Sequence, residues 1–211
     1  MQENKDVAET LSEKKLQIIT ASYELFHDKG YTATSMRDIS EAVGLTKASL
    51  YHHYASKEKL MEEVLYYIQR FLRLEIFCIA YQEQMTPKQR LTEYISKQKD
   101  VFLKNKKSCF IGNMTLEIAP LSPKFAAVLK EIFDEWVESL GDIYAHRHSK
   151  KKSKELAMQA VAEFEGAVMI GQLTPGNNSV LDKAIKRAIK RFNKKQIPNE
   201  TNTKMGRTTR S

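Results

Sequence analysis

The sequence predicts an all-α protein, and three observations support this prediction. Apolar residues recur at spacings of three and four along most of the chain, the period of a helix with one buried face. Alternation of apolar and polar residues, which marks a half-buried strand, is scarce. Glycine and proline, which interrupt helices, number only 8 and 5 among 211 residues. An apolar content of 42% is sufficient for a packed core.

The first helix is expected to begin at a capping box, in which the side chains of Thr10 and Glu13 each accept from the other's backbone N–H. Gly30 is expected to end it, because glycine readily adopts the left-handed conformation that often follows a helix. Between them, apolar residues recur at helical spacing at Leu16, Ile19, Tyr23 and Phe26.

Two short helices should come next. The first begins near Ser35, where Asp38 repeats the capping-box spacing, and ends at Gly44. The second begins after Thr46 and ends near Tyr54. Two short helices joined by a tight glycine-containing turn form a helix-turn-helix, which is a common DNA-binding unit.

Helices should also occupy most of the remaining chain. A helix of about twenty residues is expected after Ser56, and another after Pro87. Further apolar stripes predict helices near residues 109–118, 125–140, 156–170 and 179–192. The run TPGNN at 174–178 predicts a turn. The polar tail at 196–211 is expected to be disordered.

The segment 46–54, TKASLYHHY, places many hydrogen-bond donors on one short helix. Such a helix can lie in the major groove and present side chains to base edges and phosphates. Lys47 could reach a guanine or a phosphate, and Ala48 is small enough to approach a thymine methyl group. Tyr51 and Tyr54 offer hydroxyl groups to phosphates. The other donors of this segment are Thr46, Ser49 and His52.

Leu50 is left to anchor this helix to the core, and Lys57 lies in the first turn of the next helix, whose N–H groups favour phosphate. Two alternatives remain open. The segment could be an ordinary surface helix whose aromatic rings cover the core. His52 and His53 could bind a metal ion, but adjacent positions on a helix diverge, and the sequence predicts no metal site.

The net charge of +8 does not come from the helix-turn-helix region. Residues 1–60 carry eight basic and nine acidic residues, whereas residues 183–211 carry ten basic residues and one acidic residue. DNA binding by residues 1–60 must therefore depend on placed side chains rather than on bulk charge. A general nucleic-acid-coating protein that uses the basic C-terminal segment is an alternative function.

Several runs of the first 60 residues resemble the TetR family of bacterial transcriptional regulators. They are IITASYELF at 18–26, KGY at 29–31, TSMRDI at 34–39, AVGL at 42–45, LYHHY at 50–54 and SKEKL at 56–60. One departure is Tyr54, where the family more often has phenylalanine. The resemblance covers about 50 nearly continuous residues, so it is highly specific.

The resemblance implies a cytoplasmic all-α homodimer that binds a double-stranded DNA operator and releases it when a small-molecule effector binds. It implies an N-terminal helix-turn-helix DNA-binding domain at 1–56 and a larger helical effector-binding and dimerisation domain at 57–195. Tyr51 and Lys57 would be phosphate contacts. The full set of DNA-facing positions implied by the motif is Thr34, Thr46, Lys47, Ala48, Tyr51, His52 and Lys57, to which the donor argument adds Tyr54.

The effector pocket is expected among the middle helices. Runs at 109–114, 122–125 and 133–136 resemble one TetR subgroup, but they do not name a ligand. An aromatic and sulfur-rich lining would suit an apolar or aromatic effector. Plain core packing is the alternative for each candidate. The candidates are Phe71, Phe102, Cys109, Phe110, Met114, Phe125, Trp136, Phe164 and Met169.

A second hypothesis makes Cys109 a sensor of electrophiles or oxidants. The basic residues Lys104, Lys106 and Lys107, together with a following helix N-terminus, would lower the pKa of its thiol. A buried and unreactive cysteine is the alternative. Its only companion is Cys78, and two isolated cysteines fit a reducing cytoplasm.

Other classes of protein fit the sequence poorly. It has no glycine-rich phosphate loop, no metal-ligand spacing and no nucleophile motif, so we expect neither an enzyme nor a cofactor. No apolar run approaches the ~18 residues of a membrane span. The last two helices carry surplus small and apolar residues, which favours a dimer interface there. The small residues concerned are Ala160, Ala167, Ala184 and Ala188.

Overall fold

The computed structural model describes residues 12–104, 108–174 and 176–194, and over these residues the regular structure is entirely helical. The all-α prediction is confirmed. The helices of the N-terminal half are α2 (Glu13–Lys29), α3 (Met36–Ala42), α4 (Lys47–His53), α5 (Lys57–Glu75) and the 3-10 helix η1 (Phe77–Tyr81). Those that follow are α6 (Pro87–Lys104), α7 (Phe110–Glu117), the 3-10 helix η2 (Ala119–Leu121), α8 (Pro123–Ala145), α9 (Lys150–Leu173) and α10 (Ser179–Asn193).

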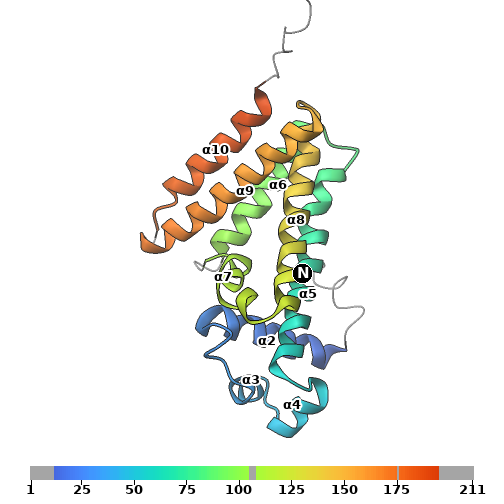
Figure 1. Ribbon diagram of the computed structural model, residues 1–211, viewed down its shortest axis with the longest axis vertical. Helices are drawn as coiled ribbons and strands as arrows, with labels where there is room; N and C mark the ends of the chain where they lie inside the picture. The colour runs from blue at the N-terminus through green and yellow to red at the C-terminus, as the bar shows by residue number, and fades with distance from the viewer. Residues whose placement is uncertain (1–11, 105–107, 175, 195–211) are drawn as a thin grey trace, which may run out of the picture.

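The helices are arranged lengthwise, with the helix-turn-helix at one end (Figure 1). Helices α2, α3 and α4 gather at that end, while α9 and α10 lie against each other at the opposite end. The long helices α5 and α8 run between the two ends. Within the described ranges, no helix is both long enough and apolar enough to cross a membrane.

Local side-chain caps begin the N-terminal helices. Ser12 caps α2 by accepting from the Lys15 N–H, and the helix begins at Glu13. Thr10, where the sequence predicted the cap, lies outside the described residues. The capping box predicted at the start of α3 is present. The Ser35 N–H donates to Asp38 Oδ2 at 2.8 Å, and the Asp38 N–H donates to Ser35 Oγ at 3.1 Å.

Glycine ends the first helix for a conformational reason. Gly30 has φ of 84°, in the region that only glycine adopts without strain, and its N–H donates to the Phe26 carbonyl at 3.0 Å. The chain then turns sharply towards α3. This turn is one of the elements that position the helix-turn-helix below the rest of the molecule.

Two apolar clusters form the core, and α8 contributes to both. The lower cluster joins α2–α5 to α7 and to the first half of α8, through residues such as Phe125 and Ile132. The upper cluster joins the second half of α8 to η1, α6, α9 and α10. The lower cluster therefore crosses the predicted boundary at residue 56, and the division at 1–56 and 57–195 stays a prediction. The tail at 196–211 lies outside the described residues.

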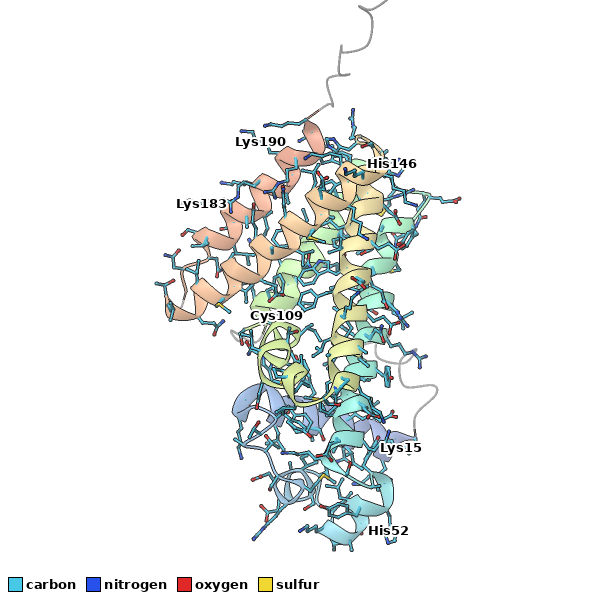
Figure 2. The ribbon with its side chains drawn as sticks, viewed as in Figure 1. Lys15, His52, Cys109, His146, Lys183 and Lys190 are labelled. Atoms are coloured by element: carbon cyan, nitrogen blue, oxygen red, sulfur yellow. The ribbon has the colours of Figure 1, made fainter. Side chains whose placement is uncertain are left out.

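The small residues predicted at a dimer interface pack inside the protomer instead. Ala160, Ala184 and Ala188 have no exposed surface, and Ala167 is 4% exposed. They allow α9 and α10 to approach their neighbours closely. The apolar side chains that α9 does expose are Met158, Met169, Ile170 and Leu173. The basic side chains of α10 include Lys183 and Lys190, which point outwards in Figure 2.

Candidate nucleic-acid interface and effector cavity

Helix α4 presents a polar face at the end of the molecule. Thr46 caps it, with Oγ1 accepting from the Ser49 N–H at 3.1 Å. Leu50 is fully buried and holds the helix against the lower core. His52 lies at the tip of the molecule in Figure 2. The other exposed residues of this face are Lys47, Ala48 and Tyr51.

A surface depression lies beside this face. It is lined by the start of α4, through Lys47 and Tyr51, and by the first turn of α5, through Ser56 and Lys57. The Lys47 ammonium lies 5.9 Å from the centre of the Tyr51 ring. The depression thus combines the cations of Lys47 and Lys57 and the Tyr51 hydroxyl with the N-terminus of α5, whose N–H groups attract anions, and its lining also includes the carboxylate of Glu58. This arrangement suits a phosphate of the DNA backbone.

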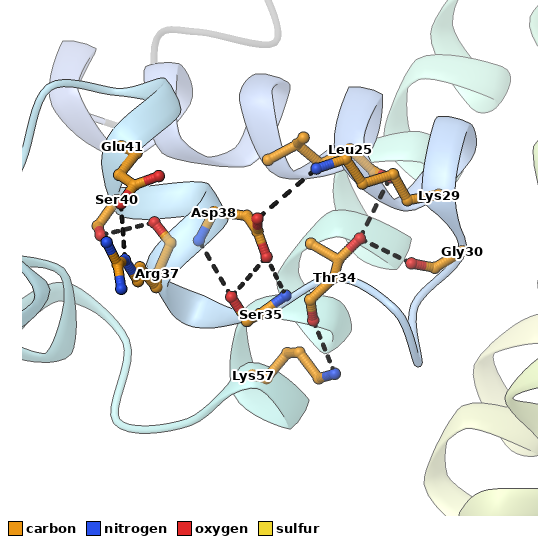
Figure 3. A network of polar contacts seen from close by, with 10 residues as sticks. All are labelled: Leu25, Lys29, Gly30, Thr34, Ser35, Arg37, Asp38, Ser40, Glu41 and Lys57. Atoms are coloured by element: carbon orange, nitrogen blue, oxygen red, sulfur yellow. Dashed lines mark hydrogen bonds and ion pairs between the residues drawn. The ribbon is translucent and has the colours of Figure 1, made fainter.

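Lys57 also fixes the loop between α2 and α3. Its ammonium donates to the carbonyl oxygens of Tyr31 and Thr34, each at 2.9 Å, and lies 4.3 Å from the centre of the Tyr31 ring. Figure 3 shows the bond to Thr34. An ammonium carries three N–H donors, so Lys57 can keep both bonds and still donate to a phosphate.

Two residues of the predicted DNA-facing set are buried, which corrects that part of the prediction. Thr34 is 1% exposed, and its hydroxyl donates to the Gly30 carbonyl at 2.7 Å (Figure 3). Tyr54 is 6% exposed, and burial, followed by the charge of Glu63, raises its pKa to about 12. Tyr54 packs in the lower cluster, and the Thr34 hydroxyl is used within the chain around the end of α2, so neither side chain is presented on the surface.

Sequence reasoning missed two residues of α3 and its cap that line the same depression. Ser35 caps the helix, and Arg37 lies in its first turn with a side chain that is 80% exposed. The Arg37 Nε donates to Glu41 Oε1 at 2.7 Å (Figure 3). The sequence contained a signal for both residues. The capping box at Ser35 fixes where α3 begins, and it therefore places Arg37 in the first turn of that helix.

A cavity of about 370 Å³ lies between α2, α5, α6, the start of α7 and α8. Its size is within the range of small-molecule sites. The Phe102 and Trp136 rings are 6.1 Å apart, and Phe133 stacks on the Trp136 ring at 5.9 Å. The predicted pocket residues that line this cavity are Phe71, Phe102, Cys109, Phe110 and Trp136.

The remaining predicted pocket residues lie elsewhere, and their assignment is corrected. Met114 and Phe125 are each 2% exposed and pack in the lower core. Phe164 is 1% exposed and packs in the upper core. Met169 is 59% exposed on α9. The helical period identifies a buried face but does not say which neighbour covers it, so it could not separate core residues from cavity residues.

Helix α2, which packs with α3 and α4 to form what we call the helix-turn-helix unit, also lines the cavity. Sequence reasoning did not predict this. Tyr23 and His27 come from this helix, and the Tyr23 ring lies 4.9 Å from the Phe110 ring. His27 Nε2 lies 2.8 Å from the Ser108 carbonyl oxygen, where an N–H donates. A molecule in the cavity would therefore touch both α2 and the segment that leads into α7.

The other end of α7 is also bonded to the helix-turn-helix unit. The carboxylate of Glu117 accepts from the Tyr31 N–H at 3.1 Å and from the Thr32 N–H at 2.7 Å. Gly30 is needed beside it, because a Cβ there would lie 3.0 Å from Glu117 Oε2. Together with the His27–Ser108 contact, these bonds tie both ends of α7 to the chain around the end of α2.

The prediction of a lowered thiol pKa at Cys109 is wrong. Burial raises this pKa well above its ordinary value, and the negative charge of Glu165 adds to the effect. Burial likewise raises the pKa of the Glu165 carboxyl group. Gly112 makes room for this carboxyl group, since a Cβ at this position would overlap Glu165 Oε2. Lys106 and Lys107 lie outside the described residues.

Comparison with known proteins gives two matching family models. "Bacterial regulatory proteins, tetR family" matches residues 18–64, and "Transcriptional regulator LmrA/YxaF-like, C-terminal domain" matches residues 87–187. Together these ranges span both the helix-turn-helix unit and the helices around the cavity. The first match covers most of the DNA-binding end, and the second covers α7 and the helices that follow it.

Individual relatives and structures agree with these models. The HTH-type transcriptional repressor DhaR of Mycobacterium sp. is 26% identical over 158 residues, covering 72% of this chain and 79% of its own. The biofilm operon regulator IcaR of Staphylococcus epidermidis is 48% identical over 46 residues, covering 22% of this chain and 25% of its own. A TetR transcriptional regulator from Legionella pneumophila has a similar fold, with a TM-score of 0.78 and 21% identity. That match covers 86% of this chain and 98% of the Legionella chain.

Proposed function

The chain belongs to the TetR family of bacterial regulatory proteins, and from this premise we propose that it is a transcriptional repressor that leaves its operator when a small molecule fills the cavity. The observation that carries this proposal is the cavity itself, because its wall includes α2 of the helix-turn-helix unit as well as helices of the larger domain. Binding at that wall can therefore act on the DNA-binding end.

The proposed DNA contacts come from the exposed face of α4 and the adjacent depression. Lys47 and Ala48 would face base edges, Tyr51 and Lys57 would bind phosphates, and Arg37 would add a further phosphate contact. The other members of the predicted set that remain exposed are Thr46 and His52. Thr34 and Tyr54 are left out because they are buried.

The contact at Lys47 can be tested once genomic fragments bound by the protein have been selected and an operator identified. Lys47→Ala should weaken operator binding by about 1–3 kcal/mol if Lys47 reads a base, with a much smaller loss on random DNA. Lys59→Ala is the matched control, because Lys59 is exposed and pairs with Glu62 away from the depression. Equal losses on both DNAs would make Lys47 a phosphate contact instead.

The effector is proposed to be apolar or aromatic. The cavity wall is dominated by aromatic and aliphatic side chains, among them Phe71, Phe102 and Trp136. Coupling between effector and operator sites should amount to about 1–3 kcal/mol, or a 5- to 150-fold change in operator affinity. The test is a compound library scored both for a change in melting temperature and for operator release. If no compound produces both effects, effector gating is wrong.

Sensing of electrophiles through Cys109 is the weaker alternative. The raised pKa keeps the thiol protonated, and the thiolate is the reactive form. Cys109→Ser should therefore leave any response to electrophiles unchanged in an operator-release assay. Loss of the response in this variant alone would restore the sensor hypothesis.

We also propose that the repressor is a homodimer joined through α9 and α10. The support is the row of exposed apolar side chains on α9, which include Ile170 at 49% exposure and Leu173 at 83%. A dimer would place two copies of α4 on one face, as a two-fold operator requires.

A further inference from the structure

Two neutral polar side-chain atoms, each on a residue that lines the cavity, lack hydrogen-bond partners among the residues that the structure describes. They are Oε1 of Gln98 on α6 and Nε1 of Trp136 on α8. Gln98 is only 6% exposed and Trp136 only 4% exposed. Burial of an unpaired donor or acceptor costs free energy, so each such group in a native protein requires an explanation, and a ligand that completes the bond is one.

Aromatic side chains surround the indole of Trp136. The Trp136 ring stacks on Phe133 and contacts Phe102, which fixes the direction of its N–H. Gln98 lies one helical turn from Phe102 on α6, and Phe71 and Ile132 also line the cavity. The cavity wall is thus mainly apolar, with the Trp136 indole N–H on α8 and the Gln98 amide on α6 among its polar groups, which also include Glu24 and His27 on α2.

We propose that these two groups select the ligand, and that the cavity takes an uncharged aromatic molecule carrying both a hydrogen-bond acceptor, for Trp136, and a donor, for Gln98. This inference rests on the proposed function only in taking the cavity to be a ligand site. It goes further by naming the ligand's polar groups and the side chains that read them. The aromatic body of the ligand would pack against Phe71 and Phe102.

An uncharged ligand fits these groups better than an anion. A carboxylate would lose its hydration against the aromatic wall, and its charge would be repelled by the oxygen of Gln98. An amide or a hydroxyl group can satisfy both protein atoms without this cost. A purely apolar molecule would leave both atoms unpaired, and sites built with buried hydrogen-bonding groups discriminate strongly against such molecules.

Three molecules of nearly equal shape test the proposal: naphthalene, 2-naphthamide and 2-naphthoate. Trp136 is the single tryptophan of the chain, so quenching of its fluorescence reports binding directly. Calorimetry replaces fluorescence for variants that lack it. The wild-type protein should bind 2-naphthamide at least tenfold more tightly than either of the other two compounds.

Two variants remove the polar atoms, Gln98→Met with little change in shape and Trp136→Phe with a smaller aromatic ring. Gln98→Met and Trp136→Phe should each reduce the preference for 2-naphthamide over naphthalene to threefold or less, while naphthalene affinity changes by less than threefold. Gln89→Met is the matched control, because Gln89 lies on the same helix but is exposed and bonds to Thr86. If Gln98→Met fails to fold, Trp136→Phe carries the same expectation.

Several outcomes would overturn the inference. They are equal affinity of the wild-type protein for naphthalene and 2-naphthamide, tightest binding of 2-naphthoate, an unchanged preference in both variants, or no binding of any of the three probes. The readout uses no DNA, so it is separate from the test of repression. Amide-selective binding without operator release would contradict the proposed function and leave this inference standing.

Discussion

The carboxylate of Glu117 offers a direct test of how firmly α7 holds the helix-turn-helix unit. It accepts hydrogen bonds from the backbone N–H groups of Tyr31 and Thr32. Glu117→Gln keeps the length of the side chain but leaves only one oxygen to accept, because the amide NH2 group cannot bond to an N–H. The variant should therefore lose one of the two bonds.

The size of the effect follows from the surroundings of this carboxylate. A hydrogen bond to a charged group contributes about 1.5–3 kcal/mol when it is buried. Glu117 is only partly buried and Thr32 is exposed, so water can replace part of the interaction. We expect Glu117→Gln to lower the free energy of unfolding by about 1 kcal/mol, which for a protein of this size lowers the melting temperature by about 2–4 °C.

The effect should also depend on pH. Burial alone would raise the pKa of Glu117, but the bonds from Thr32 and Tyr31 and the charge of Lys57 outweigh it, and the pKa is lowered. A carboxyl group with a lowered pKa in the folded state stabilises the fold fully above its unfolded value of about 4.3. This stabilisation is lost as the pH falls through the folded value. The difference between wild type and variant should therefore shrink below about pH 4.

Thermal unfolding followed by circular dichroism between pH 7 and pH 3 measures both effects. Glu83→Gln is the control, because Glu83 is exposed and lies outside α7, so this substitution removes the same charge without changing a contact of α7. Equal melting temperatures of wild type and Glu117→Gln at pH 7 would show that the two bonds do not hold α7 in place. A difference that persists unchanged at pH 3 would show that it does not come from the ionised carboxylate.

Three further changes test other parts of the structure. Tyr51→Phe should weaken binding to operator and random DNA about equally in filter-binding assays, because a phosphate contact carries no sequence information. If the variant binds both DNAs with wild-type affinity, Tyr51 is not part of the interface. Gly30→Ala should destabilise the protein by about 1–3 kcal/mol in calorimetry, because φ is 84° and the new Cβ would press on Glu117. The control Gly171→Ala meets no atom within 4 Å in a helix and should be neutral or stabilising. Ile170→Asp should convert the dimer to a monomer in light scattering, and an unchanged dimer would move the interface elsewhere.

The helices and their caps could be predicted from the sequence because their causes are local. The capping box at Ser35 involves side chains three residues apart, and Gly30 ends α2 through its own backbone conformation. Thr46 likewise caps α4 through the Ser49 N–H. Each of these contacts lies within one turn of the chain, so the spacing of residue types was sufficient to locate it.

The cavity could be predicted only in part, because its shape depends on which helices meet. Phe102 and Phe164 both occupy the apolar faces of their helices, yet Phe102 lines the cavity and Phe164 fills the core. Burial also explains why some residues that were predicted to be functional from their side-chain chemistry have other roles in the structure. The hydroxyl of Thr34 is used inside the loop, and the thiol of Cys109 lies against Glu165.

The contacts around Tyr31 give a physical route from the cavity to the DNA-binding face. Its N–H is held by Glu117 at the end of α7, and its carbonyl oxygen is held by Lys57 at the start of α5. The start of α7 lines the cavity, so a ligand that displaces α7 must move or break the bond at Tyr31. Because Lys57 also lines the depression beside Tyr51, that displacement would shift a proposed phosphate contact directly. The single residue Tyr31 thus bonds both to the helix whose start lines the cavity and to Lys57, the proposed phosphate contact, so under the proposed function a small displacement of α7 would couple the two sites.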